Sequence, residues 1–179
     1  MAINSAPHGA AYEIRTYRPG DRPAVLALFT GGMLTGHIDG LEGSDDVENI
    51  DRYYLGTSGC HFWVAQDHSG VIGMIGVVQD DRRVAHIRRL RVEPLWQQTS
   101  VAYQLVKTTV AHASDNGALK IVLHTPVDPD RATHLLTHLG FIYARSKMLH
   151  GRRLLEFYLN LYQRIPPEQE ESETLWRLT

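Results

Sequence analysis

The feature that most constrains the fold is a strand-like segment, residues 84–92, that leads through a short loop into an amphipathic helix ending near Ala113. The strand reads VAHIRRLRV, and Glu93 and Pro94 close it. In the following segment, the side chains that mark one helical face are Val101, Leu105, Val106, Thr109 and Val110. A strand followed directly by a helix predicts an α/β architecture with at least one parallel strand pair.

The remaining sequence alternates between short apolar runs and turn residues. Strands are predicted at 12–18, 61–65, 71–78, 84–92, 121–125, 141–149 and 154–161, and helices at 22–29, 47–55, about 100–113 and 130–139. The last two strands form a hairpin that turns at residues 150–153. The order β-α-α-β-β-β-α-β-α-β-β predicts the α/β (α+β) class: one domain with a mixed, mostly antiparallel central sheet of about seven strands and helices on both faces.

The length of 179 residues, with 43% hydrophobic content, suits one domain with one active site. We expect residues 1–10 to form a flexible N-terminus and residues 11–165 to form the domain. Pro166 and Pro167 end the folded pattern, and residues 166–179 are expected to form an acidic C-terminal tail.

Charge and cysteine content narrow the class of ligand. The net charge is −2 with both signs interspersed, which favours a small molecule or a peptide over nucleic acid or a membrane surface. Cys60 is the only cysteine, so an intrachain disulfide is excluded and a cytoplasmic location is expected. Apolar runs of membrane-spanning length are absent from the sequence.

The element order and the segment HIRRLRVEPLWQQTSVAYQLVKTTVAHA resemble the GNAT family of N-acetyltransferases, from Tyr12 to about Gln163. The signature of that family is Arg or Gln, two variable positions, Gly, one variable position, then Gly or Ala. Gln97, Ser100 and Ala102 occupy those three positions. The resemblance implies transfer of an acetyl group from acetyl-CoA to a primary amine, on a small molecule or a peptide, by direct attack in a ternary complex. No metal is implied, and a homodimer is an open alternative to a monomer.

The loop before the central helix is the expected cofactor site. A loop that enters a helix presents backbone N–H groups and the positive end of the helix dipole, which suit the pyrophosphate of CoA. The resemblance implies that the pantetheine arm lies along the end of the preceding strand, which must therefore diverge from the strand after Ala118. The implied contacts are Leu90, Arg91 and Val92 for this arm, and Gln97, Gln98, Thr99, Ser100, Val101 and Ala102 for the phosphates.

Attack by an amine requires a base. The resemblance places His86 at the position of the family's base, and histidine titrates near neutrality; the alternative is a hydrogen-bonded strand histidine. Glu93 is either a second candidate base or a solvated loop carboxylate. Tyr143 is either a candidate acid or a packed aromatic side chain. His124 on the next strand is equally ambiguous. Arg88 shares the face of His86 by alternation, unless a bulge intervenes, and is either a ligand for an acceptor carboxylate or a surface arginine.

Three positions depart from the family pattern and keep a second function open. Ser100 replaces a usual Gly, Pro129 a frequent Asn, and Leu136 a frequent Tyr that protonates the thiolate. Leucine donates no proton. The alternative is therefore a catalytically degenerate member that binds acyl-CoA or a protein partner as a sensor or regulator.

Two further clusters are interpreted as structural. His134 and His138 lie four residues apart, but no third ligand stands at a telling spacing, so no metal is expected. The arginines between residues 82 and 91 are expected to neutralise CoA phosphates or to solvate the sheet edge. Strand alternation predicts that Arg88 and Arg89 lie on opposite faces.

Overall fold

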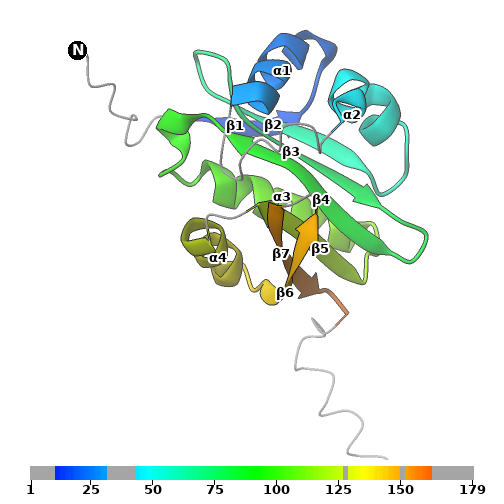
Figure 1. The fold of residues 1–179 in the computed structure, drawn as a ribbon. Helices are drawn as coiled ribbons and strands as arrows, with labels where there is room; N and C mark the ends of the chain where they lie inside the picture. Colours follow the sequence, from blue (N-terminus) through cyan, green and yellow to red (C-terminus); the bar gives the residue numbers. More distant parts are fainter. Residues whose placement is uncertain (1–10, 32–42, 127–128, 150–151, 163–179) are drawn as a thin grey trace, which may run out of the picture.

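The computed structural model describes residues 11–31, 43–126, 129–149 and 152–162 (Figure 1). The predictions for residues 1–10 and 166–179 concern residues outside these ranges. A seven-stranded sheet with the order β1-β2-β3-β4-β5-β7-β6 forms the centre of the fold. Its strands are β1 (Glu13–Thr16), β2 (His61–Gln66), β3 (Val71–Gln79), β4 (Val84–Val92), β5 (Lys120–Pro126), β6 (Ile142–Leu149) and β7 (Arg152–Asn160).

The pairing makes the sheet mixed, as predicted. β4 and β5 run parallel, and the other neighbouring strands pair antiparallel. The parallel pair is joined by α3 (Val101–Asp115), because a parallel connection must carry the chain back along the sheet. β7 lies between β5 and β6, so the final hairpin joins the sheet through its second strand.

Helices cover both faces of the sheet (Figure 1). α1 (Arg22–Gly31) and α2 (Asp45–Glu48) lie on one face, where Val25, Phe29 and Val47 join a buried cluster with strand residues such as Phe62. α3 and α4 (Pro129–His138) lie on the other, where Leu105 and Leu136 join the larger cluster. Short turns η1 (Pro19–Asp21), η2 (Asp51–Leu55) and η3 (Pro94–Trp96) complete the described elements.

The prediction of one continuous helix at 47–55 is wrong. The chain forms the short α2 and then a π-helical turn, η2, with a break at Asn49 (φ −131°, ψ 51°). The side-chain amide of Asn49 donates to the carbonyl of Asp45 (3.0 Å), and such local bonds compete with regular helix. The break also lets Tyr54 turn back to Asp46, eight residues earlier.

The predicted four-residue turn at 150–153 is also wrong. The β6–β7 ladder continues to the pair Leu149↔Arg152, so only residues 150 and 151 separate the strands. Turn-forming residue types indicate that a reversal occurs, but strand pairing sets its length.

Candidate active site

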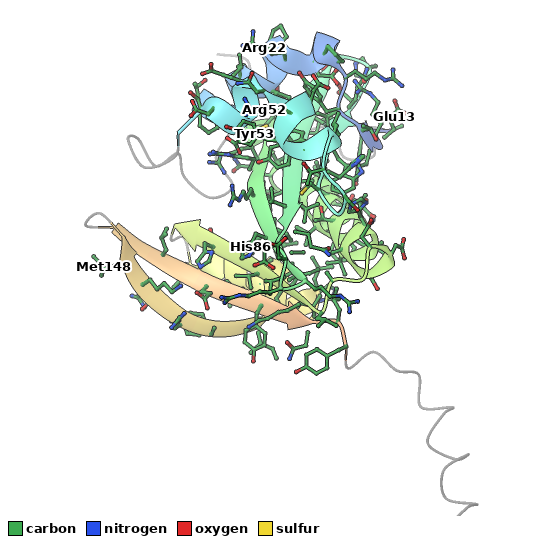
Figure 2. All side chains as sticks on the ribbon, turned by 90° about the vertical axis from the view of Figure 1, so that its right-hand side faces the viewer. Glu13, Arg22, Arg52, Tyr53, His86 and Met148 are labelled. Carbon is green, nitrogen blue, oxygen red and sulfur yellow. The ribbon has the colours of Figure 1, made fainter. Side chains whose placement is uncertain are left out.

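The two halves of the sheet part between β4 and β5. Their parallel ladder covers four pairs, from Val84↔Lys120 to Ile87↔Leu123. Beyond it, β5 follows β7 as far as Pro126↔Leu154, and β4 follows β3 as far as Val92↔Gly73. The predicted divergence is therefore confirmed, and Figure 2 shows His86 close to the junction of the two halves.

A bulge in β4 lies immediately beyond the parting point. The register with β3 shifts between the pairs Gly76↔Arg88 and Met74↔Arg91, and Arg89 has a left-handed φ of 57°. A non-glycine residue in this region costs about 1–2 kcal/mol, so the surrounding contacts must hold it there.

The bulge corrects the prediction that Arg88 and Arg89 lie on opposite faces. Arg88 pairs with Gly76, where a Cβ atom would meet Tyr54 and Phe62 on the α1–α2 side. Arg89 reaches Asp46 of α2 on that same side. The extra residue of the bulge interrupts the two-residue alternation, which is why sequence periodicity failed here.

Arg89 ties the bulge to α2. Its Nε lies 3.0 Å from Oδ2 of Asp46 and its Nη2 2.6 Å from Oδ1, a bidentate ion pair whose side chains are each about one-tenth exposed. Nη2 also donates to the carbonyl of Gly43 (2.8 Å), and the guanidinium lies 4.9 Å from the centre of the Phe29 ring. The strained residue is thus held by interactions typical of a buried arginine.

Tyr54 completes this buried group. Its hydroxyl donates to Oδ2 of Asp46 at 2.5 Å, and burial together with this carboxylate raises the pKa of Tyr54. Burial alone would raise the pKa of Asp46, but the hydrogen bonds from Arg89 and Tyr54 outweigh it and hold that pKa below its usual value. Gly76 leaves the space that the Tyr54 ring occupies, since a Cβ there would lie 2.7 Å from it.

His86 lies on the α1–α2 face, one pair before the end of the β4–β5 ladder. Its Nε2 is 3.3 Å from Oδ2 of Asp80, in the turn before β4, and its side chain is about one-third exposed. Asp80 accepts the backbone N–H groups of Val84 and Arg82 through its other oxygen, and the Val84 bond is the main cause of its lowered pKa. A carboxylate thus orients His86 while leaving its ring accessible.

Glu93 and Tyr143 lie apart from His86. Glu93 follows the far end of β4, about 20 Å along the strand from His86, and borders an open cavity of about 550 Å³ between α1 and the β2–β3 turn. Burial and then Asp67 raise the pKa of Glu93. Tyr143 on β6 pairs with Phe157 and packs edge-to-face on its ring, on the α3–α4 side. The structure therefore does not bring the three candidate catalytic residues together.

The loop predicted to bind phosphate leads into α3 as expected. The first regular helical bond runs from the N–H of Gln104 to the carbonyl of Ser100 (2.9 Å), so the N–H groups of residues 101–103 precede it. Thr99 donates its hydroxyl to the carbonyl of Trp96 (2.6 Å), and the Tyr12 hydroxyl contacts Ser100 Oγ (2.6 Å). These contacts shape a loop that contains no glycine.

The other implied cofactor contacts lie along β4 and at the loop. Leu90 and Val92 are buried on the α3 side, and Arg91 is 2% exposed. Val101 and Ala102 are buried, Gln97 and Thr99 half-buried, and Gln98 and Ser100 exposed. Most of these side chains are thus buried in the core. A ligand at this edge of β4 and at the loop would therefore contact mainly backbone groups.

Sequence reasoning missed the partners of two candidate residues. His124 on β5 has its Nε2 3.0 Å from Oε2 of Glu156 on β7, and Lys147 on β6 reaches the same oxygen at 2.6 Å. Asp46 as the partner of Arg89 was also missed. Each pair joins residues more than thirty positions apart, and no local spacing signals it.

Within the residues that the structure describes, no three His, Cys, Asp or Glu side chains gather as metal ligands. In the same residues, no helix combines the length and hydropathy needed to cross a membrane.

Solved structures of other proteins share this fold. The structure of yncA from Salmonella typhimurium, solved with its cofactor acetyl-CoA, superposes with a TM-score of 0.72 at 17% identity, over 88% of this chain and 98% of its own. An acetyltransferase of the GNAT family from Staphylococcus aureus Mu50 gives a TM-score of 0.71 at 19% identity, over 84% of this chain and 99% of its own. At such identities the likeness concerns the fold.

Sequence comparison adds the family. Human N-acetyltransferase 8 is 29% identical over 119 residues, which are 59% of this chain and 52% of that protein. N-acetylaspartate synthetase of Danio rerio is 28% identical over 97 residues, which are 54% of this chain and 34% of that protein. The chain thus spans about half or less of these relatives. Residues 29–141, more than half of the chain, match the model described as the acetyltransferase (GNAT) family. The chain belongs to the acetyltransferase (GNAT) family.

Proposed function

We propose that this domain transfers the acetyl group of acetyl-CoA to a primary amine by direct attack in a ternary complex. The observation that carries the proposal is the parting of β4 and β5 beside the first turn of α3. Where the ladder ends, the edges of β4 and β5 no longer pair with each other and could accept a thioester arm, and the helix end supplies backbone donors for a pyrophosphate. Family membership supports the same reaction.

The residues present fit such a co-substrate. The N–H groups of residues 102 and 103 and the loop 97–101, in which the Val101 N–H donates to Oγ1 of Thr99 (3.4 Å), would hold the diphosphate, and the end of β4, residues 90–92, would lie beside the pantetheine arm. His86, oriented by Asp80, would accept the proton that the amine loses as the carbon–nitrogen bond forms. Transfer in one step needs no covalent intermediate on the protein.

The acceptor is proposed to carry a carboxylate near its amine. Arg88 is exposed on the face of His86, one residue before the bulge, and a guanidinium binds a carboxylate through two parallel bonds. N-acetylaspartate synthetase, one of the relatives, is named for a product whose amine comes from an amino acid.

Removing Arg88 tests this assignment. Arg88→Ala is expected to raise KM about tenfold for an amino acid but not for the corresponding amino-acid amide, because only the acid loses a charged hydrogen bond. Arg82→Ala removes an exposed arginine from the preceding turn and serves as the matched control. An equal effect of Arg88→Ala on acid and amide would contradict the assignment.

The function itself is tested by calorimetry with acetyl-CoA and desulfo-CoA, followed by thiol release across a panel of amines. Binding of both compounds, with release of CoA that depends on an amine, is expected. Binding without turnover would favour the sensor alternative, which the apolar, 2% exposed Leu136 of α4 motivates. Absence of binding would exclude both functions.

A further inference from the structure

A second histidine–carboxylate pair lies across the opening from His86. His124 is the first residue of β5 beyond the last β4–β5 pair, and Glu156 of β7 contacts its Nε2 at 3.0 Å. Alternation along β5 places His124 on the same face as Val122, which is the register partner of His86. The two histidines therefore lie on one face of the sheet, His86 just before and His124 just after the point where the strands part, each with its own carboxylate.

Strand geometry sets their separation. Neighbouring paired strands lie about 4.8 Å apart, and two residues advance a strand by about 6.6 Å, so the Cα atoms of His86 and His124 would be about 8 Å apart if the pairing continued, and farther apart once the strands part. The acyl carbon and the attacking nitrogen would lie between these two side chains. His86 lies on the β4 side of that space and His124 on the β5 side.

Glu156 is built to hold His124. Its side chain is 14% exposed, and it also contacts Lys147 (2.6 Å) and Arg145 (3.4 Å) of β6. The hydrogen bond from Lys147, which outweighs the effect of burial, and the His124 contact lower the pKa of Glu156 to about 2. Glu156 is consequently ionised at neutral pH. The His124 side chain is 38% exposed, so its ring remains accessible to a ligand.

We propose that His124, oriented by Glu156, is the second proton-transfer residue of the acyl transfer and protonates the departing sulfur. The inference rests on the proposed function. The amine nitrogen forms a bond to the acyl carbon, the carbon–sulfur bond breaks, His86 accepts a proton from nitrogen, and the His124 imidazolium donates one to sulfur. Exchange with solvent restores both histidines. A thiol with a pKa of about 8.5 ends protonated at neutral pH, so a positioned acid limits the charge that develops on sulfur.

Kinetics of His124→Ala and His124→Gln test the proposal, the glutamine variant retaining most of the volume. Each is expected to lower kcat about 100-fold at saturating substrates, while the Kd for acetyl-CoA changes less than about twofold. Added imidazole is expected to restore kcat of His124→Ala in proportion to its concentration. Glu156→Gln is expected to lower kcat about tenfold without such rescue, because the ring is still present but less well oriented.

His68→Ala is the matched control. His68 also lies near a carboxylate, with its Nδ1 3.6 Å from Oδ2 of Asp67, but it is in the β2–β3 turn and its side chain is 86% exposed. The kcat of the His68→Ala variant is therefore expected to equal that of wild type. A kcat within about threefold of wild type for both His124 variants, or a loss that imidazole does not relieve, would overturn the role of His124 alone. A wild-type protein that releases no CoA with any amine would overturn the proposed function as well.

Discussion

His86→Gln is expected to lower kcat about 1,000-fold while the Kd for acetyl-CoA changes less than about twofold. His86 lies one pair before the point where β4 and β5 part, with Asp80 at 3.3 Å, whereas the proposed phosphate contacts lie beyond the far end of β4. Loss of a base therefore affects proton transfer, which contributes about 10²–10⁴-fold to such reactions, and not cofactor binding. Thiol release at saturating substrates and calorimetry measure the two quantities separately.

Two variants serve as references for this result. Asp80→Asn keeps the ring but removes its charged partner, and is expected to lower kcat about tenfold. His134→Gln changes an exposed histidine on α4, which covers the opposite face, and is expected to have no effect. Turnover of His86→Gln equal to that of wild type would show that His86 is not the base.

Asp46→Ala is expected to lower the free energy of unfolding by about 3–5 kcal/mol. The substitution leaves the Arg89 guanidinium, about one-tenth exposed, without the carboxylate that holds the strained bulge. Urea denaturation measures the change through the midpoint at constant m-value. Asp45→Ala, which alters the exposed neighbouring residue in the first turn of α2, is expected to stay within about 0.5 kcal/mol of wild type.

The pH dependence of stability gives an independent check. The folded-state pKa of Asp46 lies below its unfolded value, so its contribution is complete above about pH 4 and is lost as pH falls through the folded pKa. The stability difference between wild type and Asp46→Ala should therefore shrink in acid. A difference that is small at pH 7, or one that stays constant down to the acid transition, would contradict a stabilising ion pair.

Local patterns were sufficient for the segments that pack in a regular way. The apolar face of residues 101–113 predicted α3, because one helical stripe has to be buried against a sheet. The strand–loop–helix order around it predicted a parallel neighbour for β4, which the ladder to β5 confirms. The prediction failed at residues 47–55, where side-chain bonds of Asn49 and Tyr54 break the helix that the residue types favour.

The amino-acid sequence predicted the family, the order of elements and the loop at the start of α3 from patterns among residues close together in the chain, and the element order in turn predicted the mixed sheet. Which polar groups contact one another became visible only in the folded chain. The bulge at Arg89 reversed the expected side of that arginine, and strand register brought His124 to Glu156 and Asp46 to Arg89. The physical reason is that register and bulges depend on packing between distant segments, which periodicity within one segment does not encode.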